Sequence, residues 1–138
     1  MLFRSILDVE DARLAANAGA DALVVSNHGG RQLDGAPSSI SQLPAIVEAV
    51  GERIEVWLDG GIRSGQDVLK AMALGAKGTM IGRPHLYGLG AMGEVGVTKA
   101  LEIIARELDV SMALCGYNDI RNVNRDILLP GTFPQGAG

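Results

Sequence analysis

Short runs of β-prone apolar residues alternate along the chain with longer stretches whose apolar residues recur at helical spacing. This alternation is typical of βα units, in which consecutive strands lie parallel in one sheet and a helix connects them. Four units are expected, because each apolar run is followed by one helical stretch. The strands are expected at Leu2–Leu7, Ala22–Val25, Ile54–Leu58 and Gly78–Ile81, and the helices near Val9–Ala18, Ile40–Val50, Gly65–Leu74 and Glu94–Leu108.

Residues at the expected helix ends support these boundaries. Asp8 precedes the first helix, where an aspartate can accept hydrogen bonds from the free amides of the first turn. Gly19 follows the same helix and is expected to end it. Ser64 and Asp67 begin the third helix with the spacing of a capping box, in which each side chain bonds the backbone of the other residue.

A weak internal repeat indicates the size of the unit. Glu10-Asp11 through Ala18-Gly19-Ala20 matches Gln66-Asp67 through Leu74-Gly75-Ala76, 56 residues further along, and each segment leads into an expected strand. This offset corresponds to two units of about 28 residues, and eight such units would fill the roughly 250 residues of a TIM barrel. We therefore predict an α/β fold that forms the C-terminal half of a TIM barrel. The alternative, a doubly wound sheet, usually has a glycine-rich turn after its first strand, and residues 7–10 contain no glycine.

The C-terminal region differs from the repeating units. Residues 111–129 are expected to form two short helical pieces around Gly116, with Asn118 or Asp119 capping the second, and to pack against the half barrel. Residues 130–138 contain too many glycines and prolines for a regular element and are expected to form a mobile tail. The expected domain therefore covers residues 1–129.

Length and composition restrict the classes of protein to consider. The chain has 138 residues, 47% hydrophobic and 20% charged, as expected for one globular domain. Its net charge of −4 gives no indication of the basic surface that nucleic acid requires, and no apolar run approaches the roughly 20 residues that cross a bilayer. A single cysteine, Cys115, cannot form an internal disulfide, and no secretion signal is recognised, so a reducing, cytoplasmic compartment is expected.

Two turns that contain glycine and arginine follow the third and fourth expected strands. They read Asp59-Gly60-Gly61-Ile62-Arg63-Ser64 and Gly82-Arg83-Pro84. Glycine amides can approach an anion closely, arginine binds phosphate through paired hydrogen bonds, and barrel enzymes commonly bind phosphate after their last two strands. The turns therefore predict a phosphate site, with Asp59 suited to a sugar hydroxyl. The alternative is that the glycines only form tight turns and that both arginines are solvated.

A histidine and an arginine stand close together in the long connection after the second expected strand. The segment Ser26–Asp34 begins at the carboxyl end of that strand, where barrel enzymes place catalytic groups. Chemistry on an α-hydroxy acid needs a base for a proton and a cation for the carboxylate, and His28 and Arg31 are suited to these tasks. Taken alone, a histidine in a glycine loop is more often a hydrogen-bonded turn residue.

These motifs resemble one known family. Ser-Asn-His-Gly-Gly-Arg-Gln-Leu-Asp, then Leu-Asp-Gly-Gly-Ile-Arg and Ile-Gly-Arg-Pro, are similar to segments of the FMN-dependent α-hydroxy acid oxidases and dehydrogenases, which include glycolate oxidase, L-lactate dehydrogenase and mandelate dehydrogenase. The resemblance extends from about Leu7 to Leu129. It implies a TIM barrel with FMN at the C-terminal mouth and oxidation of a small 2-hydroxy acid to the 2-oxo acid. No metal ion is expected, and the electron acceptor is not indicated.

The resemblance also implies roles for individual residues. His28 would take a proton from the substrate while the flavin accepts the electrons, as a hydride or through a carbanion, and Arg31 would bind the substrate carboxylate. The segment Arg4-Ser5-Ile6-Leu7 replaces the family's usual Lys-Gly-Ile-Leu, whose lysine stabilises negative charge on the reduced flavin. The residues expected to bind the cofactor are Arg4, Ser26, Asp59, Gly60, Gly61, Arg63, Gly82 and Arg83.

Half a barrel would have two open sheet edges, near Leu2–Leu7 and Gly78–Ile81. In the family, the first half of the barrel supplies further flavin and substrate contacts and an aspartate that orients the histidine. We therefore expect a homo-oligomer, or pairing with a partner that supplies this half, and a peripheral membrane association of the parent enzyme remains open. Two other functions also remain open: a half barrel that binds FMN or phosphate without turnover, and a phosphate-sugar isomerase or lyase of the same fold.

Overall fold

The strands form one parallel sheet in the order of the sequence. The computed structural model describes residues 1–133. The sheet has the order β1-β2-β3-β4, whereas the strand order of a doubly wound sheet reverses at a switch point. The structure therefore confirms the predicted half-barrel fold, and the doubly wound alternative is wrong. The strands are β1 (Leu2–Ile6), β2 (Ala22–Ser26), β3 (Glu55–Asp59) and β4 (Gly78–Met80).

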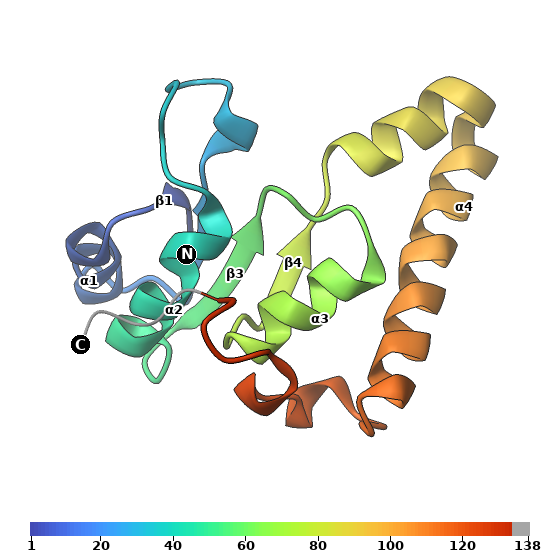
Figure 1. Cartoon of the computed structure of the whole chain (residues 1–138). Helices are drawn as coiled ribbons and strands as arrows, with labels where there is room; N and C mark the ends of the chain where they lie inside the picture. The colour runs from blue at the N-terminus through green and yellow to red at the C-terminus, as the bar shows by residue number, and fades with distance from the viewer. Residues whose placement is uncertain (134–138) are drawn as a thin grey trace.

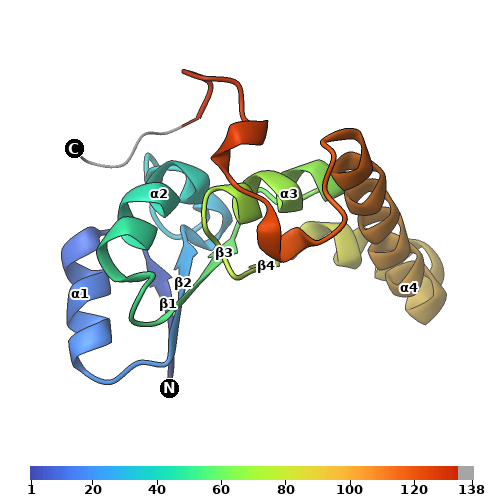
Figure 2. The same ribbon diagram turned by 90° about the horizontal axis from the view of Figure 1, so that it is seen from below.

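Each strand is followed by a helix, and the helices form an arc around one side of the sheet (Figure 2). Right-handed crossovers between strands added in one direction place all helices on the same face. Neighbouring helices also contact one another, α1 with α2 and α3 with α4. The helices are α1 (Val9–Asn17), α2 (Ser39–Val50), α3 (Gly65–Ala73) and α4 (Arg83–Leu114).

The predicted helix caps are present. Asp8 accepts hydrogen bonds from the amides of Glu10 and Asp11 at the start of α1. At the start of α3, the Ser64 hydroxyl accepts from the Asp67 amide at 3.2 Å, and the Asp67 carboxylate accepts from the Ser64 amide at 3.0 Å. The free amides of these helix ends are therefore satisfied by local sequence, as the capping patterns indicate.

The two faces of the sheet differ in character. Alternate residues of β2 and β3 face the helices and form the main core with them. Successive side chains of a strand point to opposite faces of the sheet. The opposite face therefore contains Trp57 in its middle and Ser26 and Asp59 at its carboxyl end. The core residues from the two central strands are Leu23, Val25, Val56 and Leu58, and all are fully or almost fully buried.

Helix α4 is longer than predicted, and its beginning was missed. The predicted helix covers Glu94–Leu108, whereas α4 begins at Arg83 and bends sharply at Met92 and Gly93. The two segments on either side of this bend meet at an angle (Figure 1), and their backbones touch where Gly88 meets Gly96. Glycines in the first segment weaken its helical pattern in the sequence, yet one of them, Gly88, permits this close contact with Gly96 of the second segment.

The C-terminal region packs against α3, as predicted, but its helical pieces differ from the prediction. Residues 111–114 continue α4, so between Gly116 and Phe133 only the short 3₁₀ turns Ile120–Asn122 and Arg125–Ile127 are present, and Asp119 caps the first of them. Within the predicted mobile tail, Phe133 packs against the main core. Residues 134–138 of that tail lie outside the described residues. No helix within residues 1–133 combines the length and the apolar character needed to cross a membrane.

Helix α4 crosses the first turn of α3 at Gly65. The Gly65 amide donates a hydrogen bond of 2.9 Å to the Glu107 carboxylate. This carboxylate therefore lies at the positive end of the α3 dipole, where negative charge is favourable. A Cβ atom at Gly65 would overlap the backbone of Glu107 and Leu108, so the crossing requires glycine at this position.

We expect Gly65→Ala to lower the free energy of unfolding by about 1–3 kcal/mol, the usual cost of overpacking. Gly90→Ala is the matched control, because Gly90 lies in α4 and a Cβ there would meet nothing within 4 Å. This control should be neutral or stabilise by about 0.5–1 kcal/mol, the gain of alanine over glycine in a helix. Urea unfolding followed by circular dichroism measures both changes. Equal effects of the two substitutions would contradict the packing argument.

Candidate active site

A cleft at the carboxyl ends of the strands is lined by residues of the loop after β2, the turn after β3 and the start of α4. Figure 1 shows these three segments at the same edge of the sheet. Its volume is about 370 Å³, within the roughly 300–1,000 Å³ of typical ligand sites. Ser26 is the only sequence-predicted site residue that does not line the cleft, and it is buried beside it. The other predicted residues, all of which line the cleft, are Arg4, His28, Arg31, Asp59, Gly60, Gly61, Arg63, Gly82 and Arg83.

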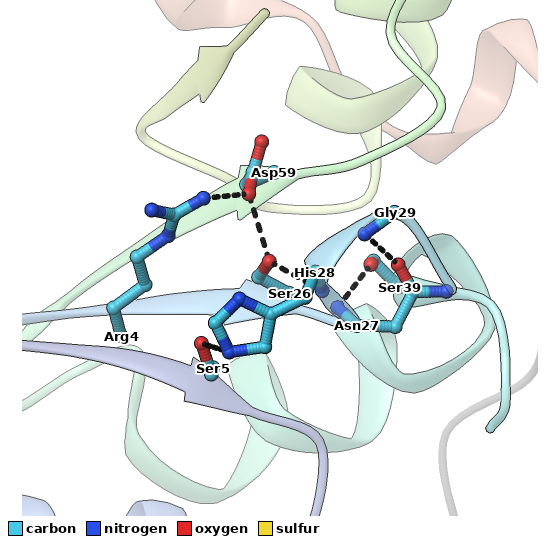
Figure 3. Close-up of polar contacts among 8 residues, drawn as sticks. All are labelled: Arg4, Ser5, Ser26, Asn27, His28, Gly29, Ser39 and Asp59. Carbon is cyan, nitrogen blue, oxygen red and sulfur yellow. Dashed lines mark hydrogen bonds and ion pairs between the residues drawn. The ribbon is translucent and has the colours of Figure 1, made fainter. Parts of the chain in front are cut away.

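The Asp59 carboxylate connects three strands at this edge (Figure 3). One of its oxygens accepts hydrogen bonds from the Arg4 guanidinium and from the Ser26 hydroxyl, each at 2.7 Å. Burial alone would raise the pKa of Asp59, but the hydrogen bonds from Arg4 and Ser26, the positive charge of Arg4 and the Gly60 amide outweigh it, so the pKa lies below the usual value. The carboxylate therefore remains charged and keeps Arg4 at the cleft.

Side chains at both ends of the loop after β2 hold its backbone. Asn27 accepts a hydrogen bond from the Gly29 amide at 3.0 Å, and the Ser39 hydroxyl accepts from the Asn27 amide at 3.1 Å. The Ser26 hydroxyl accepts from the His28 amide at 3.2 Å. An asparagine that bonds the amide two residues ahead forms a local turn, so the short 3₁₀ turn His28–Gly30 begins at a fixed place.

The His28 side chain contacts a residue that sequence analysis did not select. Its Nε2 atom lies 2.6 Å from the Ser5 hydroxyl (Figure 3). Both residues have positive φ angles, 54° for His28 and 71° for Ser5, which residues with a side chain seldom adopt. Such conformations persist where surrounding structure fixes them, and they occur often at functional sites.

The turn after β3 and the start of α4 form the second wall of the cleft. Gly60 and Gly61 have φ angles of 100° and 83°, so the turn bends as only glycine readily permits. A Cβ at Gly61 or Gly82 would meet no atom within 4 Å, so both backbones are open to a ligand. Helix α4 begins directly afterwards with Arg83 and Pro84. Proline has no N–H, but the other free amides at a helix N-terminus attract anions.

Positive charge dominates the cleft. Four arginines and one histidine line it, against the single carboxylate of Asp59. Arg83 donates to the Gly29 carbonyl at 3.2 Å and so connects α4 to the histidine loop. The guanidinium groups of Arg31 and Arg63 make no hydrogen bond or ion pair with any part of residues 1–133. The free guanidinium groups of Arg31 and Arg63 can therefore bind an anion in the cleft, and the His28 imidazole lies in the same cleft.

Sequence reasoning missed three polar residues of this site: Ser5, Asn27 and Ser39. Asn27 precedes two glycines, a pattern that favours a turn, and so could have been selected from the sequence. Ser39 begins α2 after the loop and gave no separate signal. Ser5 could not be predicted, because its contact depends on a shift in the pairing of β1 with β2 between Arg4 and Ile6.

Comparison with known proteins finds one matching family model and relatives that are about half identical in sequence. The family model described as FMN-dependent dehydrogenase matches residues 1–130. The chain is 54% identical over 128 residues to an L-lactate dehydrogenase of Caulobacter vibrioides, covering 93% of this chain and 33% of that protein. It is 48% identical over 138 residues to the pre-mycofactocin synthase of Mycolicibacterium smegmatis, covering 99% of this chain and 35% of that protein.

Solved structures agree with this result. A mandelate oxidase variant with a monooxide FMN adduct superposes with a TM-score of 0.87 and 52% identity, covering 90% of this chain and 40% of that chain. The chain therefore spans 33–40% of the length of these relatives. Because the family model matches almost the whole sequence, the chain belongs to the FMN-dependent dehydrogenase family.

Proposed function

We propose that this chain contains the FMN phosphate site and the acid–base loop of an enzyme that oxidises small 2-hydroxy acids to 2-oxo acids. Its relatives include proteins named L-lactate dehydrogenase and 2-hydroxyacid oxidase, and the solved neighbours include a mandelate oxidase. One observation supports the proposal above all others: an imidazole, free guanidinium groups and open glycine amides line one cleft.

The residues of the cleft fit the phosphate end of FMN. The open backbones at Gly61 and Gly82 leave room for phosphate oxygens, and the Arg63 guanidinium has no competing partner among residues 1–133. Arg83 and the α4 N-terminus would add positive charge, which favours a phosphate dianion. Asp59 accepts hydrogen bonds and would suit a ribityl hydroxyl, while its pairing with Arg4 limits repulsion of the phosphate.

The remaining residues would act on the substrate. When bound, FMN accepts the two electrons of the oxidation. His28 would take a proton from the 2-hydroxy acid, and Arg31 would bind the substrate carboxylate through its free guanidinium fork. Arg4, held by Asp59 at 2.7 Å, would supply positive charge at the position where the family has a lysine.

The decisive experiment combines the purified chain with FMN and records the spectrum, the mass and the response to substrate. Retained flavin absorbance that bleaches anaerobically with lactate, glycolate or mandelate is the expected result. Retained flavin without bleaching by any of them would support the alternative, a half barrel that binds FMN without turnover. Phosphate binding without flavin would support an isomerase or lyase, and absence of both would contradict the cleft assignment.

We expect Arg83→Ala to weaken FMN binding about 10- to 100-fold, because a charge-assisted hydrogen bond contributes roughly 1.5–3 kcal/mol. Arg106→Ala is the matched control, since Arg106 is exposed on α4 and does not line the cleft. Quenching of flavin fluorescence on binding gives both dissociation constants. If the two substitutions weaken binding equally, net charge explains the effect and the phosphate site is wrong.

We expect His28→Gln to slow flavin reduction by the substrate at least about 100-fold, the lower contribution of a general base, while FMN affinity stays within twofold. Anaerobic stopped-flow absorbance measures reduction. His85→Gln provides the control, because His85 is the second of the two histidines and lies outside the cleft. Loss of FMN binding in His28→Gln would show that this residue holds the cofactor instead.

The open edges of the sheet support a proposal about assembly. Within residues 1–133, β1 and β4 each pair with one strand only, and open edges favour further pairing. We propose that a second copy, or a partner with the other half of the barrel, covers these edges. Sedimentation of the purified chain should give a mass of at least two copies, and a monomer at micromolar concentration would contradict self-association. A reducing, cytoplasmic location remains a prediction.

A further inference from the structure

We propose that Arg83 is a positioning residue for the loop after β2: with one edge of its guanidinium on a bound phosphate group, it holds the Gly29 carbonyl and orders the turn that carries His28. This inference rests on the proposed function, because the phosphate is the one assigned there to FMN. The contact that supports it is the hydrogen bond of 3.2 Å from Arg83 Nη2 to the Gly29 carbonyl oxygen.

The chemistry of the two groups fixes the direction of this hydrogen bond. A guanidinium has only donors, and a carbonyl oxygen only accepts. The bond connects residues 54 positions apart in the sequence. A Cβ atom at Gly29 would lie 3.1 Å from Arg83 Nη2, so glycine at this position leaves room for the guanidinium to reach the backbone.

The other hydrogen bonds of the turn's backbone are local (Figure 3). The three amides of His28–Gly30 donate to Ser26 and Asn27, two or three residues earlier. The three residues have φ angles of 54°, 70° and 73°, and this left-handed conformation is unfavourable for the histidine. Within residues 1–133, Arg83 makes the one hydrogen bond that joins this backbone to a distant element, so the far wall of the cleft acts on the turn through Arg83.

Arg83 also has donors left for an anion. Its guanidinium carries five N–H groups, and within residues 1–133 only Nη2 has a hydrogen-bond partner, the Gly29 carbonyl. Nε and Nη1 are therefore available to a phosphate beside the open backbone of Gly82 and the free guanidinium of Arg63. The planar fork of an arginine can bind both groups at once, because its donors point in different directions within one plane.

Phosphate binding should strengthen the contact with the turn. Arg83 is exposed, and ordering a long exposed side chain costs conformational entropy that offsets much of what a single hydrogen bond contributes. A phosphate on the same guanidinium fixes the side chain, so the bond to Gly29 then forms with a smaller loss of entropy. Occupation of the phosphate site therefore stabilises the turn, and by linkage an ordered turn strengthens phosphate binding.

Inorganic phosphate is the probe, because it occupies the phosphate site without supplying a flavin. Hydrogen exchange of the Gly29 and Gly30 amides, followed by NMR of the full chain, reports opening of the turn, since both amides are hydrogen-bonded. Each protein is measured without phosphate and with saturating phosphate, judged from its own titration, at constant pH and ionic strength. The Ala12 amide, bonded to the Asp8 carbonyl in α1, is the internal reference.

Three substitutions separate the loop contact from phosphate binding. Arg83→Ala removes both contacts. Arg63→Ala is the matched control, because it removes a phosphate donor whose guanidinium has no hydrogen bond to the loop. Arg83→Lys keeps the positive charge but replaces the planar fork by one compact ammonium. Thermal unfolding of each variant checks that the fold is retained.

We expect saturating phosphate to slow exchange of both turn amides about fivefold or more in the unchanged chain, the lower end of typical coupling between two sites, and to leave Ala12 unchanged. Arg63→Ala should need more phosphate but reach the same slowing. Arg83→Ala and Arg83→Lys should show less than about twofold slowing, because the bridge from phosphate to carbonyl is lost.

Several outcomes would overturn the inference while leaving the phosphate site in place. They are phosphate binding without slowing of the turn amides, equal slowing of Ala12, slowing that persists in either Arg83 variant, and loss of slowing in Arg63→Ala. If the unchanged chain binds no phosphate at all, the proposed function is contradicted and the inference fails with it.

Discussion

The candidate site depends on one partly buried carboxylate. Asp59 ends β3, and it accepts hydrogen bonds from Arg4 of β1 and from Ser26 of β2. A charge in such a place is stable only when it is paired, so Asp59 fixes the positions of both partners. Ser26 in turn accepts from the His28 amide. The histidine loop, the arginine and the edge of the sheet are therefore organised around a single oxygen atom.

The fold could be predicted from sequence because the patterns that indicate it lie within short stretches of the chain. Helix caps such as Asp8 and the Ser64–Asp67 pair depend on a few consecutive residues, and the βα alternation determines sheet type and crossover hand. The first segment of α4 could not be predicted in this way. Its glycines lower its helix propensity, and it packs on the second segment where Gly88 meets Gly96, a contact between segments that the local sequence does not indicate.

The candidate site was predictable to a similar extent. Arginine, glycine and histidine gave a chemical signal in short motifs, and all but one of the selected residues line the same cleft. The geometry between motifs gave no such signal. Arg4 and Ser5 differ from the family's usual Lys-Gly pair, and their contacts with Asp59 and His28 join residues at least 23 positions apart. Those contacts depend on strand register and on one bulge, neither of which the local sequence specifies.

The sequential order of the strands has a consequence for how the fold is built. Each βα unit is stabilised mainly by its nearest neighbours, since every strand pairs only with strands adjacent in the sequence. Architectures of this kind approach a linear array, in which stability accumulates one module at a time. In agreement with this order, a segment equivalent to 40% of a mandelate oxidase chain superposes on it with a TM-score of 0.87. Because a helix separates the two strands of every pair, their contacts are long-range in sequence, so strand pairing should be a slower step of folding than formation of the individual helices.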